Sequence, residues 1–249
     1  MDKKKKIIVE LNLLYNHIII EMRNLRFFLI RLKHFIKFLL SKNISSNIFL
    51  GPNVQIFGLD NVLIKENCTI GENTLITVNN RTNKEIQFTI NSNVYLGRDN
   101  FFSVGKLIFI GDYCIFGNKC SLICSDHIFE TPLTPYAFTG NSFEKEIRVG
   151  VNCWFGHGVS IVGNVKIGHG SIIGANTLVT KDVPPFSMVV GNPARVIKTY
   201  NFDTNQWEKE VPSIESKYLD EEIYLKHLKT NSGNTHLAYH SASSKLGHL

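Results

Sequence analysis

Between residues 149 and 183 the hydrophobic positions recur every six residues. An apolar residue leads each hexad, and glycine follows it in four of the six cases. A small or β-branched residue comes three positions after the glycine position. The leading residues are Val149, Phe155, Ile161, Ile167, Ile173 and Val179, and the small ones are Cys153, Val159, Val165, Ser171, Thr177 and Val183. Glycine at this spacing would cost an α-helix about 1 kcal/mol per position relative to alanine. The period is instead typical of a parallel β-helix, in which each hexad forms one side of a coil.

The same pattern predicts which side chains lie inside the coils. Three hexads close one triangular coil, so equivalent residues of successive coils stack on one face. We expect the leading residue and the small residue of each hexad to point inward and to bury a continuous apolar column. Glycine is expected at the corners, where a side chain would crowd the backbone or where φ must be positive.

Less regular hexads extend this pattern toward the N-terminus. We expect one β-helix domain over residues 44–199, with about seven coils. After Leu122 the repeat stops, and Asp126 and His127 precede an excursion over residues 128–146 that contains prolines and aromatic residues. A loop of this length on a regular scaffold usually carries function. The excursion is therefore the first place to look for a site.

The segment before the β-helix, residues 1–43, is dense in Ile, Leu and Phe but interrupted by charge, and it predicts one or two helices. Its longest uncharged run, Leu11–Ile20, is shorter than the ~20 residues that span a bilayer. One interpretation is a helical cap on the end of the solenoid, with subunit contacts. The other is peripheral membrane contact through residues 7–40, with the basic side chains facing anionic headgroups.

The C-terminal part predicts three further features. Residues 188–190 and 196–197 predict a last pair of strands that closes the coils. Residues 200–229 form an extension in which Glu215–Lys229 has helical spacing. Residues 230–249 lack a core pattern and predict a disordered tail.

Composition and charge narrow the classes of partner. The 249 residues are 43% hydrophobic and 19% charged, which is ordinary for a globular protein. The net charge of +6 and the pI near 9.0 suit an anionic ligand or a membrane surface, and no nucleic-acid-binding motif accompanies them. We therefore expect no nucleic acid among the partners.

The five cysteines indicate a reducing compartment, because their number is odd and no secretory signal precedes them. The expected location is the cytoplasm, with the inner face of the cytoplasmic membrane as the alternative. Cys68, Cys114, Cys120 and Cys153 occupy the small inward slot of their hexads, whereas Cys124 lies off that slot. No disulfide framework is readable.

Three motifs carry a resemblance to a known family. They are a Trp-x-Gly pair at Trp154 and Gly156, a Thr-Lys-Asp-x-Pro-Pro run that begins at Thr180, and a Gly-Asn-Pro-Ala-Arg run that ends at Arg195. Together they resemble the hexapeptide-repeat acyltransferases, and most closely the galactoside, maltose, xenobiotic and bacterial surface-polysaccharide O-acetyltransferases. The resemblance implies an all-β fold, a left-handed parallel β-helix. It also implies a homotrimer with active sites between subunits.

The resemblance assigns catalytic roles residue by residue. In the similar enzymes a histidine opens the loop that interrupts the coils and acts as the general base, and His127 matches it. Imidazole titrates near neutral pH, so it can take a hydroxyl proton and release it again. The oxyanion donor matches the backbone N–H of His157. Asp126 is a candidate for fixing the tautomer of His127 and, with Glu130 and Tyr136, for contacting the acceptor.

The resemblance also implies acetyl-CoA as the co-substrate and no metal. Trp154 would form a wall of the pantetheine channel, although simple packing between coils would also explain a tryptophan there. The basic residues at the end of the solenoid would meet the phosphates of the coenzyme. The candidate coenzyme contacts are Trp154, Gly156, Ala175, Thr180, Lys181, Arg195 and Lys198.

The expected activity is acetyl-CoA-dependent O-acetylation of a sugar hydroxyl in a ternary complex, with a bacterial capsule, lipopolysaccharide or related glycan as acceptor. Two alternatives stay open: N-acetylation of a nucleotide-linked amino sugar, and a non-catalytic β-helix scaffold. A γ-class carbonic anhydrase would need three zinc-binding histidines. Here the position five residues after His157 is Val162, and that after His169 is Gly174.

Overall fold

The computed structural model describes residues 41–82, 84–209 and 219–232. The chain divides after Lys42 into two compact units, and the fold below is that of the unit from Asn43 onward. Most of the predicted N-terminal helical segment and of the predicted tail lie outside the described residues.

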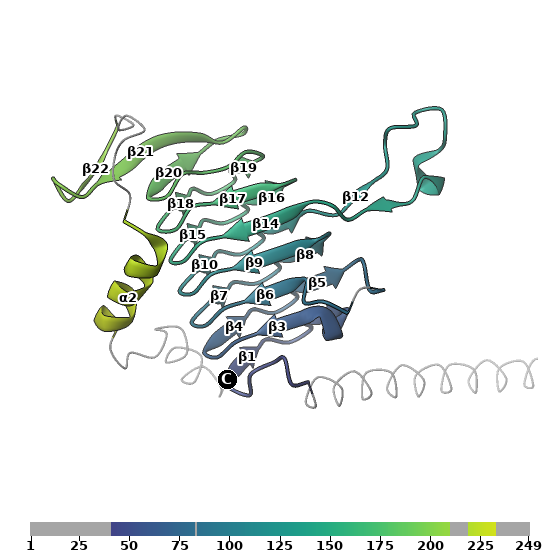
Figure 1. Cartoon of the computed structure of the whole chain (residues 1–249), viewed down its shortest axis with the longest axis horizontal. Helices are drawn as coiled ribbons and strands as arrows, with labels where there is room; N and C mark the ends of the chain where they lie inside the picture. The colour runs from purple at the N-terminus through teal and green to yellow at the C-terminus, as the bar shows by residue number, and fades with distance from the viewer. Residues whose placement is uncertain (1–40, 83, 210–218, 233–249) are drawn as a thin grey trace, which may run out of the picture. The chain divides into compact units, whose positions relative to one another are not determined.

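From Ile48 the chain winds through three sheets in a fixed order, so each turn adds one strand to each sheet (Figure 1). The coils therefore form a three-faced parallel β-helix, as the six-residue period predicts. Face 1 contains β1 (Ile48–Leu50), β4 (Cys68–Ile70), β7 (Tyr95–Leu96), β10 (Ile115–Phe116), β15 (Trp154–Phe155), β18 (Ile172–Ile173) and β20 (Ser187–Val190). Face 2 contains β2 (Gln55–Phe57), β5 (Leu75–Val78), β8 (Phe101–Val104), β11 (Ser121–Ile123), β16 (Ser160–Val162) and β19 (Leu178–Val179). Face 3 contains β3 (Val62–Ile64), β6 (Phe88–Ile90), β9 (Leu107–Ile110), β14 (Glu146–Val149) and β17 (Val165–Ile167).

The three corners of each coil form three long edges, which we name by the faces they join. The 1–2 edge follows the strands of face 1, the 2–3 edge follows those of face 2, and the 3–1 edge follows those of face 3. A short 3-10 helix, η1 (Leu59–Asn61), turns the first coil at the 2–3 edge. The excursion leaves the 2–3 edge between β11 and β14.

The interior confirms the prediction of inward positions. All six leading residues and all six small residues of the hexads between 149 and 183 are buried. Four phenylalanines extend this core through successive coils: Phe88 meets Phe102 edge-on at 5.2 Å, and Phe116 stacks on Phe155 with centroids 4.2 Å apart. Each fully buried aromatic side chain stabilises the fold by about 1.5–3 kcal/mol.

Asparagine shares the corners with glycine. At the 1–2 edge Asn53, Asn73 and Asp99 have φ values of 56°, 57° and 59°. Asn and Asp adopt this left-handed conformation more readily than other non-glycine residues. The side chains also bond from coil to coil, since Asn53 donates to Asn73 at 3.3 Å and Asn73 donates to Asp99 at 3.0 Å. The corners are therefore linked outside the core as well as within it.

All five cysteines are free and buried. Cys124 lies off the small slot of its hexad, as the sequence indicated, but it is also buried: it follows β11 as Val104 ends β8, and only 1% of it is exposed. Burial raises the pKa of the Cys68, Cys120 and Cys124 thiols from 9.0 to about 11. The thiols therefore act as small apolar core groups.

The C-terminal strands reverse direction. β21 (Arg195–Asn201) pairs antiparallel with β20, which confirms the predicted closing strand pair, and β22 (Gln206–Glu208) pairs antiparallel with β21. The described part of the predicted C-terminal helix is α2 (Glu221–Asn231). It begins at Glu221 because the Asp220 side chain accepts hydrogen bonds from the N–H groups of Glu222 and Ile223. It ends at Asn231, inside the stretch predicted as a tail.

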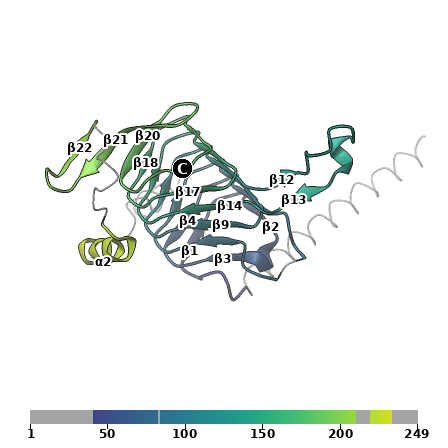
Figure 2. The same cartoon turned by 45° about the horizontal axis from the view of Figure 1, so that its top comes forward.

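α2 docks on the 3–1 edge, on the side of the solenoid away from the excursion (Figures 1 and 2). A Glu221 carboxylate oxygen accepts from the N–H of Val151 at 2.8 Å. The Tyr224 hydroxyl bonds the Asn152 side chain, and a ring nitrogen of His169 lies 2.7 Å from the Leu219 carbonyl oxygen. Burial raises the pKa of the Tyr224 phenol.

Candidate active site

The excursion begins as a small hairpin that carries His127. β12 (Asp126–His127) pairs antiparallel with β13 (Asn141–Ser142), and the N–H of Ile128 donates to the Gly140 carbonyl at 3.1 Å. The hairpin fixes the backbone of His127, while its imidazole is exposed and makes no hydrogen bond among the described residues. This side chain is thus free to meet a substrate or another chain.

Asp126, predicted to fix the tautomer of His127 or to contact the acceptor, has a different partner. Its carboxylate accepts a hydrogen bond from the Lys145 ammonium at 2.6 Å, which ties the outgoing leg of the excursion to the returning leg. Sequence reasoning missed Lys145. Its only signal was a cation close to where the repeat resumes, which does not identify a partner on the other leg.

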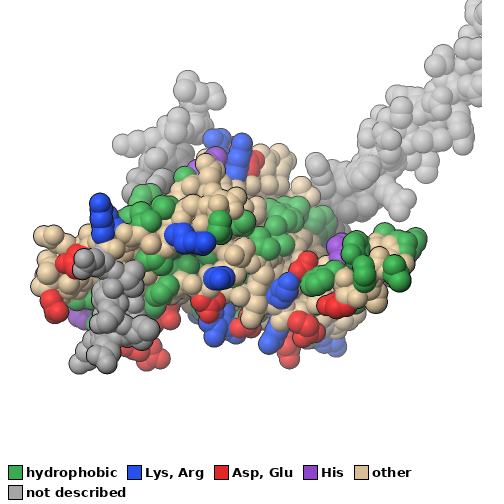
Figure 3. Space-filling view, turned by 90° about the horizontal axis from the view of Figure 1, so that it is seen from above, with side chains coloured by type: hydrophobic (Ala, Val, Ile, Leu, Met, Phe, Trp, Pro, Cys, Tyr) green, Lys and Arg blue, Asp and Glu red, His purple; other side chains and the backbone are tan. Residues whose placement is uncertain are grey.

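The tip of the excursion is apolar and exposed. Glu130 accepts from the N–H of Phe129 at 3.0 Å, and Tyr136 begins the 3-10 helix η2 (Tyr136–Phe138). Figure 3 shows hydrophobic side chains gathered over this excursion. Their exposed fractions are 58% for Phe129, 100% for Leu133, 51% for Tyr136 and 81% for Phe138.

His157 lies at the 1–2 edge, between β15 and β16. Its carbonyl accepts from the N–H of Asn176 at 2.8 Å, whereas its own N–H has no acceptor among the residues described. An unbonded N–H at a tight corner can donate to an oxygen that carries developing negative charge. Its exposed side chain plays no part in that contact.

Three other predicted residues accompany His157 along this edge. A Cβ on Gly156 would lie 2.6 Å from the N atom of Ala175, so the close stacking of coils alone requires glycine there. Ala175 is exposed at the next corner. Trp154 points outward from face 1 between Ile115 and Ile172, and 54% of it is exposed.

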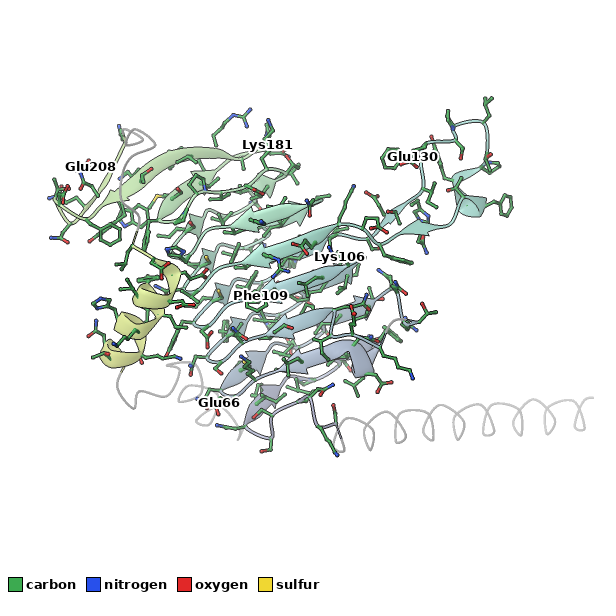
Figure 4. All side chains as sticks on the ribbon, in the orientation of Figure 1. Glu66, Lys106, Phe109, Glu130, Lys181 and Glu208 are labelled. Carbon is green, nitrogen blue, oxygen red and sulfur yellow. The ribbon has the colours of Figure 1, made fainter. Side chains whose placement is uncertain are left out.

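The remaining predicted residues lie at the end of the solenoid. Thr180 and Lys181 directly follow β19 and are exposed at the 2–3 edge, the edge that carries the excursion. Figure 4 labels Lys181. Arg195 lies at the 1–2 edge, where it pairs with Val190 and its guanidinium donates to the Ala194 carbonyl at 2.8 Å. Lys198 lies further along β21.

The predicted site residues therefore fall into two groups on opposite edges of face 2. His157 precedes β16 and His127 follows β11, and these two strands pair in register. The width of face 2 separates the two histidines within one chain, whereas a general base and an oxyanion donor must act within about 3 Å of neighbouring reacting atoms. The group at the 2–3 edge is Asp126, His127, Glu130, Tyr136, Thr180 and Lys181, and the group at or beside the 1–2 edge is Trp154, Gly156, His157, Ala175, Arg195 and Lys198.

Face 2, between the two groups, is uncharged. Its described strands carry no Asp, Glu, Lys or Arg. Its outward positions include Phe57 with 42% exposed and Val162 with 36% exposed. Face 3 differs, because Glu146, Arg148 and Lys166 lie on its strands.

The described ranges contain no group of three or more His, Cys, Asp or Glu side chains that could hold a metal ion. Within the same ranges, no helix has the length and hydropathy required to cross a membrane.

Comparison with known proteins gives one family model and several relatives. The family model described as bacterial transferase hexapeptide (six repeats) matches residues 146–181. The galactoside O-acetyltransferase of Escherichia coli strain K12 is 32% identical over 151 residues, covering 56% of this chain and 68% of that protein.

Two solved structures are among those similar to the chain. The maltose O-acetyltransferase of Clostridium difficile 630 is 27% identical with a TM-score of 0.44, covering 63% of this chain and 68% of that one. A variant of AntD, an N-acyltransferase from Bacillus cereus in complex with dTDP and coenzyme A, is 17% identical with a TM-score of 0.51. It covers 75% of this chain and 87% of that one, which shows a shared fold.

Proposed function

Because the chain belongs to the hexapeptide-repeat acyltransferase family, we propose that it transfers an acetyl group from acetyl-CoA to a sugar hydroxyl. The acceptor is a glycan of a bacterial capsule, lipopolysaccharide or related surface polysaccharide, and the enzyme acts in the cytoplasm. The proposal includes a left-handed coil and a homotrimer.

The observation that carries this proposal is the split of the candidate residues between the two edges of face 2. One chain alone cannot bring His127 to the N–H of His157. A threefold arrangement that turns face 2 toward the axis sets the 2–3 edge of one subunit beside the 1–2 edge of the next. An uncharged face is suited to burial between subunits, because no charge has to leave water.

The reaction is a direct transfer within a ternary complex. His127 takes the proton of the sugar hydroxyl as its oxygen attacks the thioester carbonyl. The backbone N–H of His157 on the neighbouring subunit stabilises the tetrahedral oxyanion, which then collapses with loss of the coenzyme thiolate. The proton passes from His127 to that thiolate, so the products are the acetyl ester and coenzyme A.

The coenzyme would run between the same two edges. Trp154 and Ala175 line its pantetheine arm from one subunit, beside Gly156. Thr180 and Lys181 approach from the other subunit, and Arg195 and Lys198 meet the phosphates, for which guanidinium and ammonium groups are suited.

The direct test is release of free thiol from acetyl-CoA in the presence of a panel of glycans. Thiol release with a hydroxyl acceptor and formation of an acetyl ester supports the proposal. Preferential acetylation of a nucleotide-linked amino sugar would replace it with N-acetyl transfer. No thiol release with any acceptor would favour a scaffold that has no catalytic role.

Subunit complementation tests the shared site. His127→Ala disables the 2–3 edge, and Ala175→Phe blocks the 1–2 edge without a clash inside the chain, because Ala175 is exposed. Each variant alone should be inactive. Co-expressed chains should recover activity. In a mixed trimer, the intact 2–3 edge of an Ala175→Phe chain can meet the intact 1–2 edge of a His127→Ala chain. Mixed trimers that stay inactive would mean that each chain holds a complete site of its own.

A further inference from the structure

A groove of about 540 Å³ lies on face 3, where that face meets the 3–1 edge. This volume is within the range of small-ligand sites. Its lining includes, besides His169, a phenyl ring, two prolines, two cations and two carboxylates. They are Phe109, Pro184, Pro185, Arg148, Lys166, Asp182 and Glu221.

The β-helix register brings the polar members together. Arg148 of β14 pairs with Phe109 of β9 on one side and with Lys166 of β17 on the other, so the three outward side chains form one column. The bridge between Ile167 and Val183 places Asp182 next to Lys166. Asp182 accepts from the N–H of Lys166 at 2.8 Å through one oxygen, which leaves its other oxygen for a ligand.

The two cations of the column differ in their partners. Arg148 bonds Glu146 at 2.8 Å, and this contact holds the pKa of the Glu146 carboxyl below its ordinary value. The Lys166 ammonium is exposed and makes no ion pair with any residue in the described ranges. Lys166 acts on Glu146 only at longer range, so its ammonium has room to bind an anionic ligand in the groove.

The groove is separate from the proposed active site. It borders the 3–1 edge, whereas His127 and His157 lie on the other two edges. α2 completes it, because Glu221 lines the groove while its carboxylate holds Val151. Phe109 lies on the body of the solenoid, well away from Glu130 of the excursion (Figure 4).

We propose that this groove binds one ring of a saccharide that carries a negative charge. The apolar face of the ring packs on Phe109 and the prolines. Its hydroxyls donate to Asp182 and Glu221, and its anionic group accepts from Lys166 and Arg148. A groove with both donors and acceptors over an apolar floor suits such a ring better than it suits a hydrocarbon or a bare anion.

The groove would hold a distant unit of a long acceptor chain, and this role rests on the proposed function. The binding itself does not, because it requires neither acetyl-CoA nor His127. The anionic group could be a carboxylate of an acidic polysaccharide or a phosphate of a phosphorylated sugar.

Binding is measured on the full chain without acetyl-CoA, by calorimetry and by NMR. The probes are tetragalacturonate against neutral maltotetraose, and glucose 1-phosphate against glucose. We expect at least one charged probe to bind about tenfold more tightly than its neutral counterpart, as expected for a hydrogen bond to a charged group. Added salt should weaken that binding. Binding of tetragalacturonate identifies a carboxylate, and binding of glucose 1-phosphate alone identifies a phosphate.

Variants locate the binding. Lys166→Gln should weaken binding of the charged probe about tenfold. Phe109→Leu should weaken that binding severalfold, because the side chain stays apolar but loses its ring. Lys65→Gln, which removes an exposed lysine outside the groove, is the matched control and should leave binding unchanged. Equal effects of the two lysine variants, or equal affinity for charged and neutral sugars, would overturn the inference. Absence of acetyl transfer alone would count against the proposed function and leave this result standing.

Discussion

Two histidines lie at opposite edges of face 2, and each contributes a different atom to the proposed reaction. His127 contributes its imidazole, which the β12–β13 hairpin presents to solvent. His157 contributes only its main-chain N–H, which has no acceptor in the described part of the chain. Substitution of the two side chains should therefore have unequal effects.

His127→Ala should lower kcat by about 10²–10⁴-fold, the usual effect of losing one positioned base. His127→Asn should behave alike, because an amide can hold a hydrogen bond but cannot take the proton. Steady-state kinetics across pH provide the measurement, and the acidic limb of the pH–rate profile should disappear. His157→Ala keeps the N–H and should lose far less activity. Equal losses, or a larger loss for His157→Ala, would mean that the general base has been assigned to the wrong histidine.

The buried thiols predict a pH dependence of stability. Burial raises the pKa of Cys68, Cys120 and Cys124 from 9.0 to about 11, so between these values the folded chain holds protons that the unfolded chain has lost. Stability is therefore fully present below pH 9 and falls as pH rises toward 11, with about a tenfold loss in the folding equilibrium per thiol and pH unit.

Urea unfolding at a series of pH values measures this loss. The midpoint should fall steadily above pH 9, and Cys120→Ala should reduce the slope with pH even though the variant is less stable at every pH. A midpoint that stays level to pH 11, or an unchanged slope in the variant, would contradict the role of the thiols.

Among the elements, the coils were predictable from the sequence and the added parts less so. Each hexad repeats the same steric requirement, which made residues such as Phe155 and Ile161 certain to point inward. The burial of Cys124 was not predicted because this residue directly precedes the excursion, where the hexad count breaks. The start and the end of α2 depend on the capping hydrogen bonds of Asp220 and Ser232, which helical spacing alone does not reveal.

The candidate site was predictable only as a set of residues. The motifs identified His127 and Arg195 by resemblance, but both lie where the hexad count breaks, at the excursion and after Val183, so the six-residue spacing does not indicate which edge of a coil they occupy. The Asp126–Lys145 pair and the groove on face 3 depend on contacts between distant residues, and the sequence carries no periodic signal for them.

The contact between α2 and the 3–1 edge can be tested in the same way. Glu221→Ala removes the acceptor of the Val151 N–H, and loss of a hydrogen bond to a charged acceptor costs about 1.5–3 kcal/mol. Hydrogen exchange of Val151 and of α2 should then accelerate about tenfold or more. Glu222→Ala is the matched control, since it removes an exposed acid from the same first turn. Equal acceleration in both variants would mean that helix charge, rather than docking, sets the protection.

For the whole molecule, the assembly is the property to test. Light scattering should give the mass of a trimer. Val162→Asp puts a charge on the uncharged face 2 and should dissociate the trimer, because burial of an unpaired carboxylate is strongly unfavourable. Ile197→Asp, at a position 40% exposed on β21, is the control and should remain trimeric. A monomeric parent chain, or a trimer that tolerates Val162→Asp, would remove face 2 from the interface.

The excursion leaves and rejoins the solenoid at a single corner. The N–H of Cys124 donates to the Ser103 carbonyl, and the N–H of Lys106 donates to the Lys145 carbonyl, so both ends of the excursion lie beside one short turn of the preceding coil. β14 then resumes its register with β9 and β17 as though nothing had intervened. The length and the composition of the excursion therefore do not affect how the coils stack. Evolution, or an engineer who grafts a loop from one β-helix to another, can therefore exchange the insert without changing the pairing of β14 with its neighbours.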